Sequence, residues 1–400
     1  MKAMILAAGR GTRVRPLTET LPKPMIPIIH KPVMEMLVDH LRKHGFEQIM
    51  VNTSYLAPQI EGYFRDGHRF GVSMGYSFEG FIDDGQLIDQ PVGSAGALQK
   101  IQCHSGFFDD DFVVVCGDAM VDLDLSEMLA FHRARKSIAT VALKRVPARE
   151  LVNYGVAVLD DERRILEFQE KPAAGTELSD LANTGIYMFA PEIFNWIPKN
   201  TVYDIGSQLL PALAAAGAPI HGLELPFDWF DIGRLNDYYR VVMQALRGEA
   251  PPYNLPGVHV RPDVWAGLNV RANWDRIKFS GPVVIGGSAS IGDGCEITGP
   301  VMIGANACIE EGAQIDASII LDHTRVSGFA SYQGKVVGSN FCFDPEGTVL
   351  DSKHTDTDWL FSDARSPAIA PSRDQRFVMS HSREAALAQR VGPIGVERAE

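Results

Sequence analysis

The N-terminal part of the chain alternates between short apolar runs and stretches with apolar residues at helical spacing. Residues 3–8 form an apolar run with no polar break, which is typical of a strand buried on both faces of a parallel sheet. Residues 33–44 repeat apolar side chains at helical spacing and end before Gly45, which predicts an amphipathic helix. The alternation continues to a helix at 235–246. We therefore predict an α/β domain over residues 1–247, Rossmann-like, with a mixed, mostly parallel sheet.

The pattern changes completely after Gly281, where one aliphatic residue recurs at every sixth position. A period of six is neither helical nor a simple strand alternation. It is typical of a hexapeptide parallel β-helix, in which the recurring residue points inward. We predict a short left-handed β-helix over residues 281–343, with about two to three coils, after a proline-marked linker at 248–280. The recurring residues are Ile285, Ile291, Ile297, Ile303, Ile309, Ile315 and Leu321.

Residues 344–400 lose this periodicity and turn polar. We expect a mobile tail there, with a short helix near 383–390. The open ends of a short β-helix favour capping by another protomer, so we also expect a homo-oligomer.

The bulk composition restricts the class of protein. Of the 400 residues, 46% are hydrophobic and 22% charged, and the net charge is −13; this suits a globular protein and gives no reason to expect nucleic acid as a partner. No apolar run reaches the roughly 18–20 residues that span a bilayer, and the N-terminus lacks the layout of a secretory signal. The five cysteines are scattered, so we expect reduced thiols, no structural zinc, a cytoplasmic location and no membrane partner.

A glycine-rich loop follows the first predicted strand and opposes the acidic balance of the chain. Gly9, Gly11 and Thr12 lie in a turn whose backbone amides can approach an anion closely. The loop is neither a Walker A motif nor a dinucleotide fingerprint, so an ordinary loop with solvated arginines remains an alternative to a phosphate site. Within the first 31 residues Glu19 is the only acid, against the basic residues Lys2, Arg10, Arg13, Arg15, Lys23 and Lys31.

Other candidate residues follow predicted strands or precede a helix. Asp118 follows an apolar strand at 111–116, at the edge where open α/β sheets bind ligands, and Mg²⁺ is the natural partner of a carboxylate there; the alternative is a capping residue. Glu170 and Lys171 are adjacent on a strand, so their side chains should point to opposite faces and not pair; a solvated turn is the alternative. The loop at 91–96 runs into a helix that begins near residue 95. This helix N-terminus either contacts a base or a phosphate, or is an ordinary loop-to-helix turn.

The string at 6–18, followed by Pro22-Lys23-Pro24-Met25, resembles the signature of the sugar-1-phosphate nucleotidylyltransferases, also called nucleotide-sugar pyrophosphorylases. The resemblance covers nearly all of residues 1–343 and includes segments at 91–98, 168–172, 183–187 and 227–233. Within that family the chain is most similar to the cyanobacterial-type UDP-glucose pyrophosphorylase group. It is also similar to the GDP-mannose pyrophosphorylases, which share the β-helix. The tail beyond Phe343 departs from the cyanobacterial-type group.

The resemblance implies a role for each matching position. Mg²⁺ would be held by Asp118 and Asp231, with Asp228 a weaker candidate. The catalytic cations would be Arg13 and Lys23. The nucleotide would contact Leu6, Ala8, Gly9, Gly11, Thr12, Gln90 and Gly96. The sugar phosphate would contact Gly155, Glu170, Lys171 and Asn183.

The implied reaction joins a nucleoside triphosphate to a sugar 1-phosphate and releases pyrophosphate, with UTP and glucose 1-phosphate as the first choice. Mannose-1-phosphate guanylyltransferase and glucose-1-phosphate thymidylyltransferase activities are the alternatives, because glucose and mannose differ only at C2 and the sequence does not place the atoms that read the base. A non-catalytic regulatory subunit is the alternative of another class, and acyl transfer by the β-helix a further one. The complete set of charged motif residues favours the enzyme.

Overall fold

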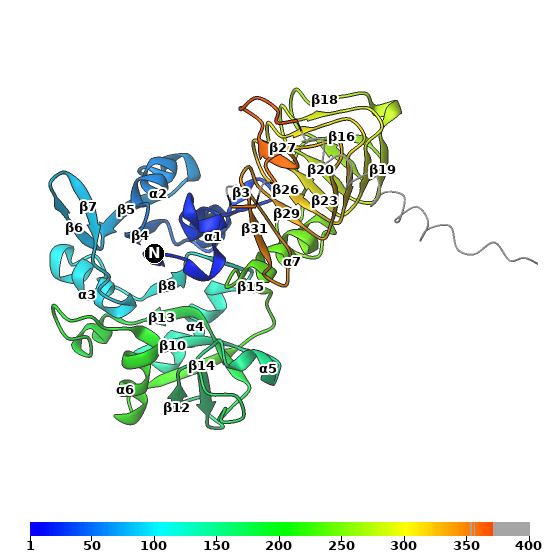
Figure 1. Ribbon diagram of the computed structural model, residues 1–400. Coiled ribbons are helices and arrows are strands. Elements are labelled where there is room, and N and C mark those ends of the chain that lie inside the picture. The colour runs from blue at the N-terminus through cyan, green and yellow to red at the C-terminus, as the bar shows by residue number, and fades with distance from the viewer. Residues whose placement is uncertain (353, 356, 371–400) are drawn as a thin grey trace, which may run out of the picture. The chain divides into compact units, whose positions relative to one another are not determined.

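The computed structural model describes residues 1–352, 354–355 and 357–370, which divide into a first compact unit, Met1–Asp237, and a second that begins at Tyr238 (Figure 1). The elements of the first unit are β1 (Lys2–Leu6), η1 (Thr12–Val14), η2 (Leu17–Glu19), η3 (Lys23–Met25), β2 (Pro27–Ile28), β3 (Lys31–Pro32), α1 (Val33–Lys43), β4 (Gln48–Thr53), α2 (Ala57–Phe64), η4 (His68–Phe70), β5 (Ser73–Phe78), β6 (Gly80–Asp83), β7 (Gln86–Asp89), α3 (Ser94–Ser105), β8 (Phe112–Cys116), β9 (Ala119–Val121), α4 (Leu125–Arg135), β10 (Ala139–Arg145), α5 (Ala148–Leu151), β11 (Val156–Leu159), β12 (Ile165–Gln169), β13 (Leu181–Phe189), η5 (Pro191–Asn195), the π-helical turn η6 (Ile205–Leu209), α6 (Leu210–Ala215), β14 (Ile220–Glu224) and β15 (Trp229–Asp231). Helix α7 (Leu235–Leu246) begins in the first unit and continues into the second.

A mixed sheet of nine strands forms the centre of the first unit, as predicted for the fold class. Strands β5, β4, β1 and β8 are parallel neighbours. The antiparallel strand β13 joins β8 to the remaining strands β10, β11, β12 and β14. Because β1 and β8 run in the same direction, Leu6 and Cys116 end at the same edge of the sheet, where ligands of such folds bind.

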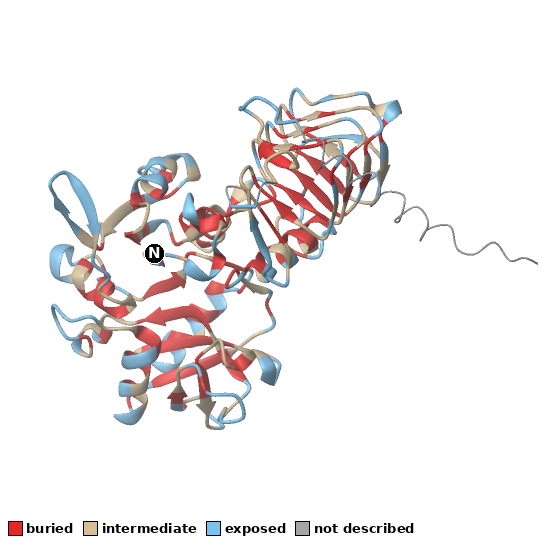
Figure 2. Ribbon diagram, viewed as in Figure 1, coloured by how far each residue is buried: buried red, intermediate tan, exposed pale blue. Residues whose placement is uncertain are grey.

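The continuous apolar run at the N-terminus is explained by burial on both faces of this sheet. Ala3 and Ile5 belong to one core cluster, together with residues of α1, α2 and α4. Met4 points to the other face and belongs to a second cluster, with residues of α3 and α6. Figure 2 shows the resulting buried central strands between more exposed helices.

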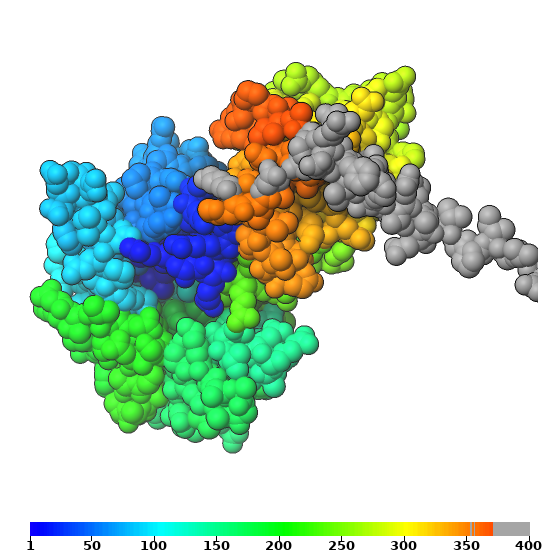
Figure 3. Space-filling model, viewed as in Figure 1, coloured from blue at the N-terminus to red at the C-terminus, as the bar shows by residue number. Residues whose placement is uncertain are grey.

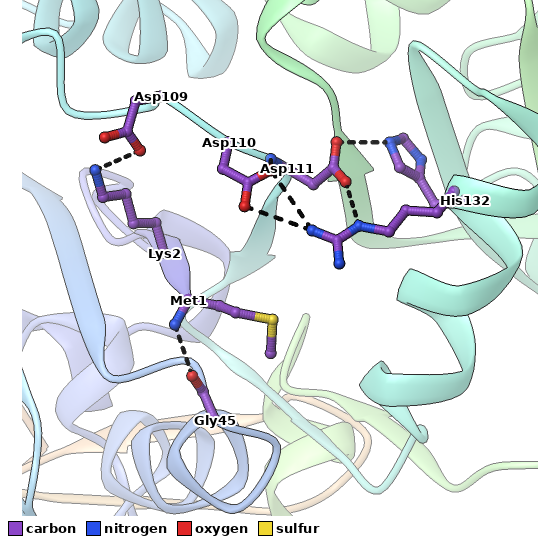
Figure 4. A network of polar contacts seen from close by, with 8 residues as sticks. Met1, Lys2, Gly45, Asp109, Asp110, Asp111 and His132 are labelled. Atoms are coloured by element: carbon purple, nitrogen blue, oxygen red, sulfur yellow. Dashed lines mark hydrogen bonds and ion pairs between the residues drawn. The ribbon is translucent and has the colours of Figure 1, made fainter.

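Polar contacts at the opposite, amino-terminal edge of the sheet hold the chain start in place (Figure 4). The Met1 ammonium group donates to the Gly45 carbonyl at 2.9 Å, and Lys2 pairs with Asp109 at 2.6 Å. Nearby, Asp111 accepts from Arg133 at 2.7 Å. Lys2 therefore takes no part in the cationic N-terminal group predicted from the sequence. Lys31 is likewise engaged elsewhere, by carboxylates of α1.

His132 lies at this edge and is 1% exposed. Its Nδ1 is 2.8 Å from Thr140 Oγ1, and its Nε2 faces Asp111 at 3.7 Å. Burial lowers the pKa of His132 to about 4, which the Asp111 charge opposes.

We predict that His132 makes the first unit acid-sensitive. The unfolded chain takes up a proton below about pH 6.5, whereas the folded chain does so only near pH 4, so stability falls as pH drops between these values. The full contribution is about 3 kcal/mol. In His132→Gln the calorimetric midpoint should fall less over this range. The exposed His68→Gln variant should follow wild type, and an equal fall in His132→Gln and wild type would contradict the prediction.

The second unit contains three sheets of short strands, shown in yellow-green to orange in Figure 1. Its strands are β16 (Val258–Arg261), β17 (Val264–Ala266), β18 (Arg271–Ala272), β19 (Lys278–Ser280), β20 (Val283–Ile285), β21 (Ser290–Ile291), β22 (Glu296–Thr298), β23 (Val301–Ile303), β24 (Cys308–Ile309), β25 (Gln314–Asp316), β26 (Ile319–Ile320), β27 (Thr324–Val326), β28 (Ser331–Gln333), β29 (Val336–Val337), β30 (Phe341–Phe343), β31 (Val349–Asp351) and β32 (Phe361–Asp363), with a 3₁₀ turn η7 (Trp274–Arg276) between β18 and β19.

Between β17 and β29 the neighbouring strands of each sheet pair in parallel, which is consistent with the predicted β-helix. Ile285 pairs with Ile303, and Ile297 with Ile315, so these coils each take three hexapeptides. The next coil is one residue shorter: Ile303 pairs with Ile320 rather than Leu321. Ile320 is fully buried and Leu321 only partly. The last of the seven predicted inward positions is therefore corrected from Leu321 to Ile320.

The parallel winding is longer than the predicted 281–343 and its two to three coils. It begins at β17, inside the predicted linker, and the sheet that starts there contains five parallel strands, β17, β20, β23, β26 and β29. The first coil escaped the six-residue pattern because larger side chains such as Trp274 and Phe279 pack against its core and its buried isoleucine, Ile277, lies out of step with the repeat.

The predicted tail is also structured where it is described. Strands β30 and β31 continue one sheet in antiparallel fashion, and β32 pairs with β27. At the other end of that first sheet, β16 pairs antiparallel with β17. Both ends of this sheet are thus extended by the chain itself, which weakens the open-end argument for a homo-oligomer. The helix predicted near 383–390 lies outside the described residues. No helix in the described part of the chain is both long and apolar enough to cross a membrane.

We predict that the inward isoleucines hold the second unit together. Ile297 is 1% exposed, and Ile297→Ala should lower the free energy of unfolding by about 2–5 kcal/mol, because it removes buried methylenes and leaves a cavity. Leu268, which is 88% exposed, provides the control: Leu268→Ala should change stability by less than about 0.5 kcal/mol. Denaturant unfolding measures both, and equal losses would contradict the predicted core.

Candidate active site

The glycine-rich loop leaves β1 at the carboxyl edge of the sheet and is fixed by hydrogen bonds. The Ala7 amide donates to Asn52 Oδ1 at 2.8 Å, and Thr18 Oγ1 donates to the Gly11 carbonyl at 2.7 Å. Gly11 has φ +61°, and a Cβ there would lie 2.9 Å from Thr18 Cγ2, so this turn requires glycine. Figure 3 shows the deep blue N-terminal segment at the surface beside the cyan segment, to which Arg10 is joined by an ion pair with Asp89.

Two adjoining cavities of about 360 and 290 Å³ open along the ends of β1 and β8. The residues that line both are Leu6, Lys23, Ser94, Cys116 and Asp118. The first cavity also contains the predicted nucleotide contacts Ala8 and Gly9. The second also contains the predicted residues Arg13, Gly155, Glu170, Lys171, Asn183 and Asp231. The structure therefore brings segments from distant parts of the sequence to one edge of the sheet.

A cation between two carboxylates lies where the cavities join. Asp118 directly follows Gly117 at the end of β8, and Asp231 ends β15, which pairs with β9 so that Asp231 lies opposite Ala119. Lys23 Nζ binds Asp118 Oδ2 and lies 4.0 Å from Asp231 Oδ1. The Lys23 side chain is 12% exposed. Three separate elements, η3, β8 and β15, thus deliver these charges to one point.

The charges at this point control each other's ionisation. Burial lowers the pKa of Lys23, but the Asp118 and Asp231 charges outweigh burial and leave it raised. Burial and the neighbouring Asp118 charge raise the pKa of Asp231 to about 6, and Lys23 opposes them. Two carboxylates this close need positive charge nearby to stay ionised.

Asp118 and Asp231 fit a small divalent cation. Such an ion commonly takes one or two protein carboxylates and completes its shell with water and substrate phosphate oxygens. The excess negative charge that raises the Asp231 pKa is what a second cation would relieve. Among the described residues, no group of three or more His, Cys, Asp and Glu side chains is placed to hold a metal, so phosphate and water would supply the remaining ligands.

The predicted sugar-side residues gather in the second cavity around Glu170. A Cβ on Gly155 would lie 2.7 Å from Glu170 Oε2, so glycine leaves room for that carboxylate. Asn183 Nδ2 donates to Tyr187 Oη at 2.9 Å. Glu170 and Lys171 form an ion pair at 3.2 Å, which corrects the expectation that they point apart. The reason is local: β12 ends at Gln169, and Lys171 has φ +43°, so strand alternation no longer applies.

Some predicted nucleotide contacts lie elsewhere. Gln90 and Gly96 line a separate cavity of about 260 Å³, whereas their neighbours Gly93 and Ser94 line the first cavity. Gly11 and Thr12 follow Gly9 along the loop, beyond the residues that line the first cavity.

Asn52 and Glu79 line the first cavity and were missed from the sequence. They are 3% and 2% exposed, and Asn52 Nδ2 donates to Glu79 Oε1 at 2.5 Å. Glu79 Oε2 accepts from the Val92 amide at 3.0 Å. Together with the bond from Ala7 to Asn52, this pair links the glycine-rich loop to the loop before α3. The available sequence signal was a polar residue ending an apolar strand, as Asn52 does near the end of β4.

We predict that Glu79→Gln loosens both loops. The amide has only one acceptor atom, so one buried donor, Asn52 or Val92, loses its partner; this should cost about 1–3 kcal/mol. Hydrogen exchange of the Ala7 and Val92 amides should accelerate. Glu47→Gln, at an exposed position, is the control, and unchanged exchange in Glu79→Gln would contradict the linkage.

Comparison with known proteins adds independent information. Residues 2–248 match the nucleotidyl transferase family, and residues 279–346 match the GMPPB C-terminal domain. A UTP–glucose-1-phosphate uridylyltransferase of Synechocystis sp. is 51% identical over 369 residues, which are 92% of this chain and 95% of that protein. A mannose-1-phosphate guanylyltransferase of Mycobacterium tuberculosis is 30% identical over 296 residues, 74% of this chain and 77% of the relative.

The fold of this chain is also similar to that of a solved structure. A crystal structure of a UDP-glucose pyrophosphorylase complexed with UDP-glucose aligns with a TM-score of 0.51 and 25% identity. The alignment covers 59% of this chain and 95% of the other.

Proposed function

The chain belongs to the nucleotidyl transferase family, and we propose that it transfers a uridylyl group from UTP to glucose 1-phosphate, giving UDP-glucose and pyrophosphate. The family match bears out the resemblance found in the N-terminal motifs. The choice of UTP and glucose 1-phosphate is supported by the relative that is 51% identical over most of both chains. Among structural observations, the group Lys23, Asp118 and Asp231 carries the proposal, because it offers both a cation and a metal site in one substrate-sized cleft.

The reaction needs charge neutralisation rather than a covalent nucleophile. An oxygen of glucose 1-phosphate attacks the α-phosphorus of UTP, a new P–O bond forms, and the bond to the β-phosphate oxygen breaks with release of pyrophosphate. The attacking phosphate is already an anion at neutral pH, so no general base is required. The obstacle is the approach of two anions, and enzymes of phosphoryl transfer overcome it by positioning and electrostatics.

The cleft residues divide this task. The Ala8–Gly9 backbone and Arg13 hold the triphosphate and the departing pyrophosphate, and Lys23 neutralises charge at the α-phosphate. Lys171 orients the sugar phosphate, and Glu170 accepts from sugar hydroxyls. Asp118 and Asp231 would hold Mg²⁺, which when bound would supply further positive charge for the approach of the two anions.

Mannose 1-phosphate with GTP is the second candidate pair, favoured by the match of residues 279–346 to the GMPPB C-terminal domain. The same cleft residues would serve it, because the charges act on phosphates shared by both reactions. Pyrophosphate release with Mg²⁺ over a grid of four nucleoside triphosphates and three sugar 1-phosphates (glucose, mannose and N-acetylglucosamine) decides between them. A maximum at UTP with glucose 1-phosphate is expected. A maximum at GTP with mannose 1-phosphate would overturn the substrate choice, and turnover of no pair would favour a non-catalytic subunit.

We also propose a cytoplasmic location, because all five cysteines are free thiols, which is typical of a reducing compartment. The homo-oligomeric state stays a prediction from the sequence.

We predict that Lys23→Ala and Asp118→Ala each lower kcat about a hundredfold or more, because a preorganised charge is lost at the transferring phosphate. A second Lys–Asp pair serves as the control: Lys2 and Asp109 are joined at 2.6 Å at the opposite edge of the sheet. Lys2→Ala and Asp109→Ala should keep kcat within about twofold, since this pair lies away from the cleft and an ion pair with the largely exposed Asp109 contributes little. Near-normal turnover in Lys23→Ala, with an unchanged circular dichroism spectrum, would contradict the assigned role.

A further inference from the structure

Two chain segments on either side of the cleft are joined backbone to backbone. The Gly96 amide donates to the Tyr203 carbonyl at 2.8 Å, and the Tyr203 amide donates to the Val92 carbonyl at 3.0 Å. The approach is close because position 93 is glycine: a Cβ on Gly93 would lie 2.4 Å from the Tyr203 carbonyl oxygen. The end of the loop before α3 and the first turn of that helix are therefore attached to the segment that leads into η6. Gly93 in the loop and Ser94, the first residue of α3, line the nucleotide-side cavity.

Ser94 adds a side-chain link to this attachment. Its Oγ donates to Asp204 Oδ2 at 2.7 Å and accepts from the Ile205 amide at 2.8 Å. Ser94 lines both cavities of the cleft, whereas Asp204 and Ile205 line the sugar-side cavity only. One hydroxyl group thus connects the first turn of α3 to the first turn of η6.

The η6 end of this link lies against the Glu170 carboxylate, which we assign to the sugar hydroxyls. A Cβ on Gly206 would lie 2.8 Å from Glu170 Oε2, so η6 and the Glu170 carboxylate are in close contact. Asp204 caps η6 by accepting from the Ser207 amide at 2.9 Å. Burial raises the pKa of Asp204, but hydrogen bonds from Ser207 and Ser94 outweigh burial and hold it below its ordinary value. Asp204 is therefore ionised at neutral pH and available to accept from Ser94.

We propose that Ser94 is a positioning residue that couples the two substrate sites, so that nucleotide bound beside the loop before α3 raises the affinity for the sugar 1-phosphate beside η6. The inference rests on the proposed function, because it takes the two cavities as the nucleotide and sugar-phosphate sites.

The physical basis is shared ordering. A ligand that fixes Gly93 and the first turn of α3 also fixes Ser94, and through Ser94 it fixes Asp204, Gly206 and the space around Glu170. The second ligand then binds to a site that is already ordered, so its binding costs less conformational entropy. Coupling of this kind is reciprocal, so the sugar phosphate must raise nucleotide affinity by the same factor.

The test compares Ser94→Ala with a matched variant, Ser207→Ala. Ser207 Oγ also donates to the Asp204 carboxylate, at 3.1 Å, but it lies on η6 itself and makes no link to the loop before α3. Isothermal titration calorimetry of the full chain with Mg²⁺ would measure the Kd of α,β-methylene-UTP, whose α–β bridge is not cleaved, without and with saturating glucose 1-phosphate. The ratio of the two Kd values is the coupling factor.

We expect a factor of about five or more in wild type and in Ser207→Ala, falling to near one in Ser94→Ala. If Ser94 instead contacts one ligand directly, both Kd values change together and the ratio persists, which overturns the inference. A wild-type ratio of one, with both ligands binding, overturns it as well. Failure of either ligand to bind wild type contradicts the proposed substrates themselves, and repeating the titration with GTP and mannose 1-phosphate analogues then tests the coupling separately.

Discussion

The site of the first unit depends on bringing the carboxylates of Asp118 and Asp231 together around one ammonium group at the edge of a buried sheet. Burial and mutual repulsion both raise the pKa of Asp231, and the Lys23 ammonium group opposes them. None of the three side chains is close to another in sequence. The parallel pairing of β1 with β8 and the antiparallel pairing of β9 with β15 are what bring them together. One ammonium group only partly compensates the repulsion between the two carboxylates. The cluster is therefore suited to bind a metal ion, whose charge reduces that repulsion and in turn attracts anionic phosphates.

The glycine-containing segments around this cluster are held by buried polar groups in addition to hydrophobic contacts such as those of Ala7 and Val92. Asn52 and Glu79 tie the loop after β1 to the loop before α3, and Ser94, the first residue of α3, ties that helix to η6. Glycine permits the backbones to approach closely, but it costs conformational entropy. Hydrogen bonds to groups that have little access to water recover part of that cost. As a consequence, the conformation of each segment around the cleft depends on that of the segments to which it is hydrogen-bonded.

The sequence predicted the chemistry of the site better than its geometry. The apolar runs at β1 and β8 predicted buried strands, and Asp118 was expected at a ligand-binding edge because parallel strands end there together. The pairing of Asn52 with Glu79 could not be predicted, because it joins two strand ends across twenty-seven positions with no local signal. The contact between Glu170 and Lys171 was missed because a positive φ at Lys171 breaks strand alternation. The inward position after Ile315 was misplaced by one residue because a single coil is one residue shorter.

The proposed function implies an origin for substrate preference. Lys23, Lys171 and the two aspartates would act on phosphates that all candidate substrate pairs share, so they would not distinguish one base or one sugar epimer from another. The base and the sugar would instead meet backbone at Gly93, Gly155 and Gly206 and the carboxylate of Glu170, all of which line the two cavities. Glu79 bonds to the segment that carries Gly93, and Ser94 and Asp204 bond to the segment that carries Gly206. Substitutions in these buried polar groups should therefore change substrate preference more than substitutions of the cations do.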